Sequence, residues 1–166
     1  MRQNKTALLV NAILVFVLVG ALLITANVGV GASTPSPAFG AYGGITTASA
    51  PLTKVDLSVE VYDESGDFDP TLDRFVAPVD GIYHFDGRGS LKFPGDGNHI
   101  AVYLFKNGTF TDEGIHGGFN NGGVNSTSIM VGGTLKLQAG DYIELFISRS
   151  TGSGQATGSL TGHLVN

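Results

Sequence analysis

The spacing of apolar residues constrains the fold of residues 38–166 more than any other feature of the chain. Apolar side chains alternate with acidic or hydroxyl ones over residues 55–61, which is typical of a half-buried strand. Similar short apolar runs, bounded by Gly, Asn, Asp or Pro, occupy residues 74–78, 82–93, 99–106, 126–137, 142–147 and 160–165. No segment after residue 32 shows the periodicity of a helix. We therefore expect an all-β domain of roughly eight to ten short strands in two packed antiparallel sheets.

Turn residues between these runs predict where the chain reverses. Pro78 followed by Asp80-Gly81 predicts a tight turn before a central strand, and Asn107-Gly108 predicts a hairpin. Within residues 126–137, Gly132-Gly133 predicts a β-bulge. The small polar residues 150–158 predict a loop before the last strand.

An uncharged, apolar stretch from residue 7 to residue 26 follows Arg2 and Lys5. As a helix it would span about 30 Å, the thickness of a bilayer core. The segment is either a signal peptide, cleaved near residues 30–32, or an uncleaved signal anchor. Both alternatives place the following domain outside the cytoplasm, secreted or membrane-anchored. The expected organisation is an N-terminal apolar helix within residues 1–32, a Pro/Ser/Thr linker at 33–37 and the β domain at 38–166.

Charge and cysteine content exclude several classes of function. All fourteen acidic residues follow residue 32, whereas Arg2 and Lys5 precede it, so the β domain carries a net charge of about −7. An acidic domain is a poor partner for nucleic acid, whose phosphates require Lys and Arg. The chain has no cysteine, which excludes disulfides and cysteine-based metal or nucleophile chemistry.

Five segments share a pattern with one known family of β domains. They are residues 38–41, 75–85, 104–108, 135–143 and 160–164. Together they resemble the globular-head domain of complement C1q, a member of the tumour-necrosis-factor-like jelly rolls. The resemblance covers about residues 38–166 and implies a jelly-roll β-sandwich. It also implies a homotrimer in which aromatic residues are buried between the subunits.

Nine residues carry most of this resemblance: Phe39, Phe75, Pro78, Gly81, Tyr83, Phe85, Gly140, Asp141 and Gly162. We expect Tyr83 and Phe85 to point into the sandwich, and Gly162 to let the last strand approach its neighbours closely. The sequence departs from the family at Leu160, where the family has an aromatic residue.

Oxygen-bearing side chains stand at alternate positions of one acidic segment: Asp63, Ser65, Asp67 and Asp69. This is the spacing of a calcium loop, but Phe68 and Arg74 stand where an EF-hand requires Gly and Glu. Asp63, Asp67 and Asp69 are therefore a candidate for a looser calcium site, and the alternative is a solvated loop. Calcium is the only cofactor that the sequence suggests.

The Gly- and Asn-rich run at 114–126 is either a variable ligand loop or a structural segment near the threefold axis. Candidate ligand residues in and beside it are Asp112, Glu113, His116, Asn120, Asn121 and Asn125. Asp112, Glu113 and His116 lack a nearby nucleophile or a second converging carboxylate, so we expect no catalysis.

The expected function is recognition without catalysis: a homotrimeric, extracytoplasmic head that binds a surface protein or a glycan. Three weak loop sites on one rigid trimer would act through avidity. The alternative is a structural subunit of a surface appendage, filament or virion. In that case the N-terminal segment or the domain edges would mediate polymerisation.

Overall fold

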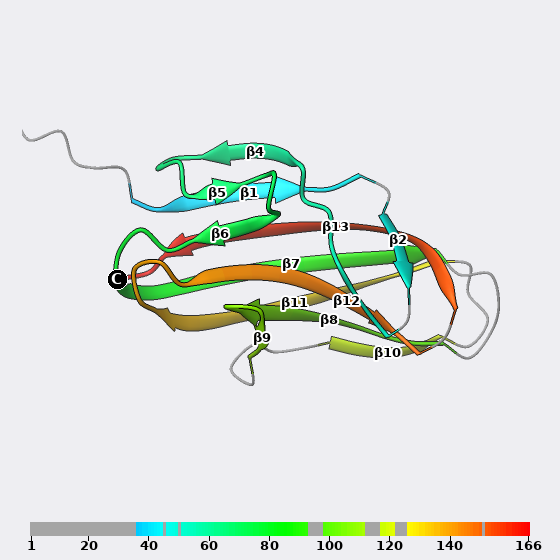
Figure 1. Ribbon diagram of the computed structural model, residues 1–166. Coiled ribbons are helices and arrows are strands. Elements are labelled where there is room, and N and C mark those ends of the chain that lie inside the picture. Colours follow the sequence, from blue (N-terminus) through cyan, green and yellow to red (C-terminus); the bar gives the residue numbers. More distant parts are fainter. Residues whose placement is uncertain are drawn as a thin grey trace, which may run out of the picture. The chain divides into compact units, whose positions relative to one another are not determined.

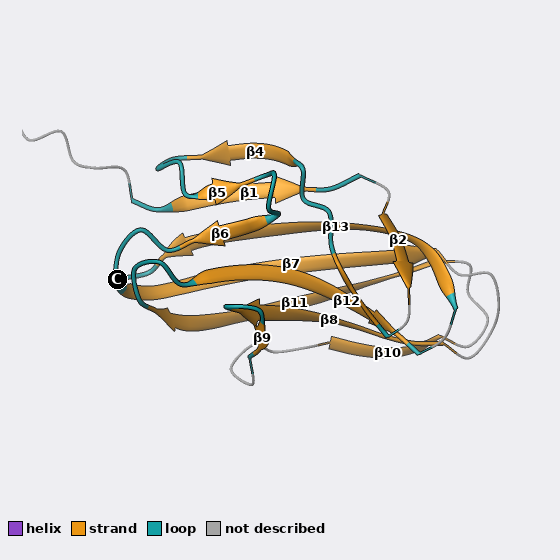
Figure 2. Ribbon diagram, viewed as in Figure 1, coloured by secondary structure: helices purple, strands orange, loops and turns teal. Residues whose placement is uncertain are grey.

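Figure 1 shows the computed structural model of the chain, which describes residues 36–44, 46–49, 51–92, 98–111, 117–121, 126–150 and 152–166. These residues belong to one compact unit, Pro35–Asn166. The predicted N-terminal helix and linker residues 33–35 lie outside the described residues, so both stay predictions. Within the described part of the chain, no helix is long and apolar enough to cross a membrane. Every regular element there is a strand (Figure 2), as expected of an all-β domain.

The first sheet has β11, β7, β13, β1 and β4 as neighbours in that order, and β2 also pairs with β13. The bounds are β1 Ala38–Tyr42, β2 Thr46–Ser49, β4 Val59–Asp63, β7 Gly81–Lys92, β11 Ser126–Leu137 and β13 Ser153–Leu164. All its pairings are antiparallel. The two longest pairings join β7 to β11 and to β13, which run side by side along the molecule (Figure 1).

The second sheet has the order β10, β8, β12, β6 and β5, with β3 paired to β12 and β9 paired to β8. The bounds are β3 Leu52–Lys54, β5 Phe68–Asp69, β6 Arg74–Val76, β8 Asn98–Lys106, β9 Thr109–Phe110, β10 Gly117–Asn121 and β12 Tyr142–Arg149. This sheet is also antiparallel throughout. The two sheets confirm the predicted jelly-roll β-sandwich.

An aromatic cluster fills one part of the core between the sheets. The ring of Phe39 stacks on Phe68 and Phe75, with centroids 5.0 and 4.9 Å apart. Tyr83 and Phe85 are both fully buried beside it, and the Tyr83 hydroxyl donates a hydrogen bond to a backbone carbonyl at 2.8 Å. Such pairs add to the stabilisation from buried area, and the bonded hydroxyl avoids a desolvation penalty.

The alternation at residues 55–61 predicted one half-buried strand, and this prediction is wrong in two respects. Strand β4 begins only at Val59, and its Val59 and Val61 side chains are 40 % and 64 % exposed. Val55 and Leu57 are buried in the core but precede the strand. The Leu57 N–H donates to a carboxylate of Asp73 at 2.7 Å instead of joining a ladder. As the edge strand of its sheet, β4 has a neighbour on one side only, which leaves its side chains more accessible.

Two glycine-rich segments also differ from expectation. Gly132 and Gly133 pair with Asp86 and Phe85 in an unbroken register, so the predicted bulge is absent there. The register shifts instead in the pairing of β1 with β4, between Gly40 and Ala41. A Cβ at Gly132 would come within 2.8 Å only of the end of the exposed Asp86 side chain, which can move aside. The predicted loop at 150–158 is mostly strand, since β13 already begins at Ser153.

Candidate functional site

The outer face of the second sheet carries aromatic side chains, whereas the solvent-facing side of an antiparallel sheet is ordinarily polar. Tyr103 and Phe105 project there from β8, in the phase opposite to the buried Val102 and Leu104, and Phe146 projects from β12. The exposed residues Phe110 of β9 and Leu52 of β3 extend this surface. We call these five residues the aromatic face.

The rings of the aromatic face pack against one another. The centroids of Phe105 and Phe146 lie 4.3 Å apart, and Tyr103 meets Phe110 edge to face at 5.4 Å. Phe110 and Leu52 nevertheless remain 38 % and 39 % exposed. A shallow groove of about 490 Å³ lies along this surface, lined by Pro51, Leu52, Tyr103, Phe105, Phe110 and Ser148. A contiguous exposed apolar patch of this kind is typical of a surface that binds another protein.

An ion pair flanks the aromatic face. Lys54 Nζ of β3 lies 2.6 Å from a Glu144 carboxylate oxygen of β12, and Glu144 stands opposite Phe105 in the β8–β12 ladder. The Glu144 side chain is 12 % exposed, so its charge depends on the lysine for compensation. The pair ties β3 to the sheet beside the groove.

Asp141 connects the hairpin β8–β9 to the start of β12. Its carboxylate accepts hydrogen bonds from Lys106 Nζ at 2.8 Å, from Asn107 Nδ2 at 2.7 Å and from the Gln138 N–H at 2.8 Å. These bonds, that from Lys106 first, lower the pKa of Asp141 to about 2. The Asn107 Oδ1 in turn accepts the Tyr142 N–H at 2.9 Å. Asp141 and Asn107 thus hold the turn together.

The acidic segment proposed for calcium uses its carboxylates within the loop. Asp63 accepts the N–H groups of Gly66 and Phe68 at 3.0 and 2.8 Å, and Asp69 accepts two further N–H groups. The Ser65 hydroxyl donates to Asp67. Among the described residues, no three His, Asp or Glu side chains gather closely enough to hold a metal ion. Calcium binding stays a prediction.

The predicted ligand loop is only partly described. Asp112, Glu113, His116 and Asn125 lie outside the described residues. Asn120 and Asn121 belong to β10, where the backbone pairs with β8, so this part of the run is a strand and not a loop. The structure therefore does not test whether these six residues bind a ligand.

The aromatic face was not predicted from the sequence, although a signal for it was present. In β8, Ile100, Val102 and Leu104 point into the core, while Tyr103 and Phe105 occupy the opposite phase of the alternation. A strand that is apolar in both phases is expected to be covered on both faces. Residues 99–106 were predicted only as a short apolar run, so the outer face of this strand received no role.

Comparison with solved structures shows which known folds this domain resembles. The globular domain of zebrafish complement 1qA protein is 22 % identical, with a TM-score of 0.56 over 78 % of this chain and 98 % of that domain. Eiger TNF from S. frugiperda is 15 % identical, with a TM-score of 0.53 over 80 % of this chain and 94 % of its own. PRD1 vertex protein P5 is 12 % identical, with a TM-score of 0.55 over 80 % of this chain and 99 % of its own.

These similarities confirm the C1q/TNF-like jelly-roll fold that the sequence predicted. No protein-family model matches the chain, and no curated protein matches it significantly. At these identities the comparisons establish the fold, and function has to be argued from the surfaces of this chain.

Proposed function

We propose that this chain is a non-catalytic recognition protein that acts outside the cytoplasm as a homotrimer, with the aromatic face buried between subunits. The observation that carries the proposal is the aromatic face on the second sheet, where Phe110 and Leu52 are exposed and Tyr103, Phe105 and Phe146 are partly buried. Leaving these groups in water costs about 25 cal/mol for each Å² of apolar area, which association would recover.

The C1q-like resemblance supports a closed trimer over an open assembly. Members of that family pack three jelly rolls about a threefold axis, with aromatic residues between the subunits. In this chain, the aromatic residues lie on one face of one sheet, so each subunit can bury them against its neighbours. Three copies in one trimer would then act together through avidity.

Location outside the cytoplasm rests on the N-terminal sequence. The basic start and the apolar stretch at 7–26 direct export whether the segment is cleaved or retained. A retained segment would hold the trimer on a membrane, and a cleaved one would release it.

A second candidate function is that of a structural subunit of a virion or surface appendage. The observation that favours it is the similarity to PRD1 vertex protein P5, which spans 99 % of that chain. Under this alternative, the exposed edge strand β4 or the N-terminal segment would join one trimer to the next.

The trimer can be tested by placing a charge on the aromatic face of the full-length chain. We expect Phe110→Arg to convert trimers into monomers, because burying an unpaired guanidinium at an interface is strongly unfavourable. Met130→Arg is the matched control, since Met130 is 69 % exposed on the first sheet. Sedimentation velocity in mild detergent measures the assembly, and circular dichroism verifies folding.

If Phe110→Arg fails to fold, Leu52→Arg on the same face provides a second variant. A trimer that survives both charges would refute the proposed interface. Filaments in the wild type that dissolve on deletion of residues 1–32 would favour the structural-subunit function.

A further inference from the structure

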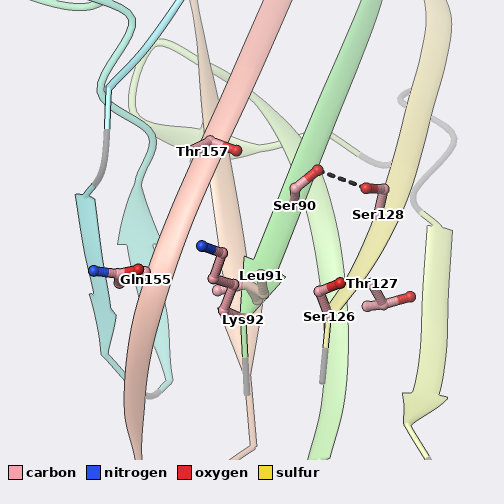
Figure 3. Close-up of a pocket in the computed structure, with 8 residues that line it drawn as sticks. All are labelled: Ser90, Leu91, Lys92, Ser126, Thr127, Ser128, Gln155 and Thr157. Carbon is pink, nitrogen blue, oxygen red and sulfur yellow. Dashed lines mark hydrogen bonds between the residues drawn. The ribbon is translucent and has the colours of Figure 1, made fainter. Parts of the chain in front are cut away.

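Strand β4 ends the first sheet, so one side of its backbone has no neighbouring strand among the described residues. Strands inside the sheet differ: in Figure 3, Ser90 of β7 lies between Ser128 of β11 and Thr157 of β13. At the opposite end of the sheet, β11 lies against β10 of the second sheet. Strand β4 lies at the outer margin of the domain (Figure 1). Its outward N–H and carbonyl groups are therefore available to an added strand.

Apolar side chains lie on one face of β4. Val59 stands opposite Tyr42 of β1, and Tyr62 stands opposite Gly40. The Tyr62 ring covers Gly40, since a Cβ added to this glycine would lie 2.5 Å from the ring. Tyr42 and Tyr62 are nevertheless 50 % and 43 % exposed. Directly opposite residues of an antiparallel pair share one face, so Tyr42, Val59 and Tyr62 form an exposed apolar row along the edge.

Acidic side chains lie on the other face of β4. Glu60 stands opposite Ala41 and Asp63 stands opposite Phe39, and both of these β1 residues are buried in the core. The Glu60 side chain is exposed and forms no ion pair with a described residue. A strand added to β4 would therefore meet apolar groups on one of its faces and carboxylates on the other.

Negative charge is concentrated around this edge. Half of the fourteen acidic residues of the chain lie within residues 55–73, and no Lys, Arg or His does. They are Asp56, Glu60, Asp63, Glu64, Asp67, Asp69 and Asp73. None of them forms an ion pair with a described residue. Carboxylates on an edge strand disfavour pairing with a second copy, because like charges repel, whereas a strand that carries cations would be attracted.

We propose that β4 binds an extended segment of a partner protein in which basic and apolar residues alternate. The segment would add a strand to the first sheet, with its cations beside Glu60 and Asp63 and its apolar side chains beside the exposed row. Protection against self-pairing explains the carboxylates but not the exposure of Tyr42, Val59 and Tyr62, which a docked strand would cover. This inference rests on the proposed recognition function and names the class of its partner, at a site separate from the aromatic face.

Fluorescence anisotropy of a labelled heptapeptide of alternating lysine and valine, titrated with the full-length chain in mild detergent, tests the partner class. Two versions, N-methylated at the lysines or at the valines, keep the charge of the peptide, and each lacks the N–H groups of one strand edge. We expect at least one methylated version to bind at least about tenfold more weakly than the parent peptide, because backbone hydrogen bonds are lost. If the parent peptide does not bind, or if both methylated versions bind as tightly, the proposal is wrong.

Charge variants locate the site. We expect Glu60→Lys to weaken binding of the parent peptide by a factor of about five to ten, because an attraction becomes a repulsion. Asp86→Lys is the matched control: it changes the net charge equally, at an exposed carboxylate of β7, and should change binding less than about twofold. Bound peptide should slow hydrogen exchange within residues 59–63. Equal losses in the two variants, or protection that spares β4, would overturn the site.

The assembly state of the same samples separates this inference from the proposed function. Trimers that do not bind the parent peptide would refute only the β4 site, and monomers that bind it would refute only the trimer. Complexes larger than a trimer that the peptide disperses would show that a second copy of the chain occupies β4, and would overturn the inferred partner.

Discussion

Asp141 shows how one side chain can organise a turn. Asp141 follows Gly140, whose positive φ of 90° is a conformation that favours glycine in a turn. Its hydrogen-bonding partners could not be predicted, because Lys106 and Asn107 lie more than thirty residues earlier in the chain. Only the β8–β12 register, in which Lys106 pairs with Ile143, brings them to the carboxylate.

We expect Asp141→Asn to lower the free energy of unfolding at neutral pH by about 1–2 kcal/mol, through loss of the charge-assisted bonds. The pKa of Asp141 is about 2 in the folded protein, below about 3.9 for an unfolded aspartate. Its contribution to stability is therefore present above about pH 4 and is lost as the pH falls from about 4 toward 2. The variant should lack this part of the pH dependence, as measured by urea unfolding from pH 2 to pH 7.

Asp86→Asn provides the control for this measurement. The Asp86 carboxylate is 57 % exposed and contacts only His84 among charged side chains of the described residues. Removing this carboxylate charge should leave the pH dependence of the free energy of unfolding below about pH 4 nearly unchanged. If Asp141→Asn retains the wild-type slope between pH 4 and pH 2, the assigned role of Asp141 is incorrect.

At the scale of elements, the sequence predicted the positions of the strands along the chain better than the pairing of one strand with another. The runs at 99–106 and 126–137 correspond closely to β8 and β11, because each is bounded by strong turn residues. Strand β13 was predicted too short, because its first half consists of small polar residues that resemble a loop. These residues form a strand because β2 pairs with residues 153–156 and β7 pairs from residue 156 onward, which a local pattern cannot reveal.

The aromatic face could have been predicted only in part. Tyr103 and Phe105 alternate with core residues along β8, which is a local signal. Leu52, Phe110 and Phe146 join them only because β3 pairs with β12, and β9 and β12 pair with β8, which a local pattern cannot reveal.

The close packing of β13 on β7 can be tested at Gly162. A Cβ added there would lie 2.5 Å from the Phe85 ring and 2.7 Å from the Phe39 ring. We expect Gly162→Ala to destabilise the protein by about 1–3 kcal/mol, because the aromatic cluster must shift to admit a methyl group. Thermal unfolding followed by circular dichroism measures the change.

Gly44→Ala is the matched control, since the nearest atom to its added Cβ is 3.9 Å away, in ordinary contact. The free energy of unfolding of this variant should lie within about 0.5 kcal/mol of the wild-type value, as is usual for surface substitutions. If both alanine variants are equally stable, the close approach of β13 is not what requires glycine at residue 162.

At the scale of the whole molecule, the two outer faces of the sandwich differ in chemistry. The second sheet presents the aromatic face, whereas the first sheet presents hydroxyl-bearing and basic side chains, among them Arg88, Ser90 and Lys92. The spacing of apolar residues predicted the all-β class, and the segments that resemble the C1q globular head predicted the jelly roll. The chemistry of each outer face required the structure, because it depends on which side chains share a surface.

Native mass spectrometry of the full-length chain tests the proposed assembly most directly. We predict a closed complex of three identical chains, each of 17.2 kDa if the N-terminal segment is retained and smaller by about 30 residues if it is cleaved. The aromatic face is expected to hold this complex together over a range of protein concentrations. A single chain at all concentrations, or an open series of masses without a dominant trimer, would contradict the account.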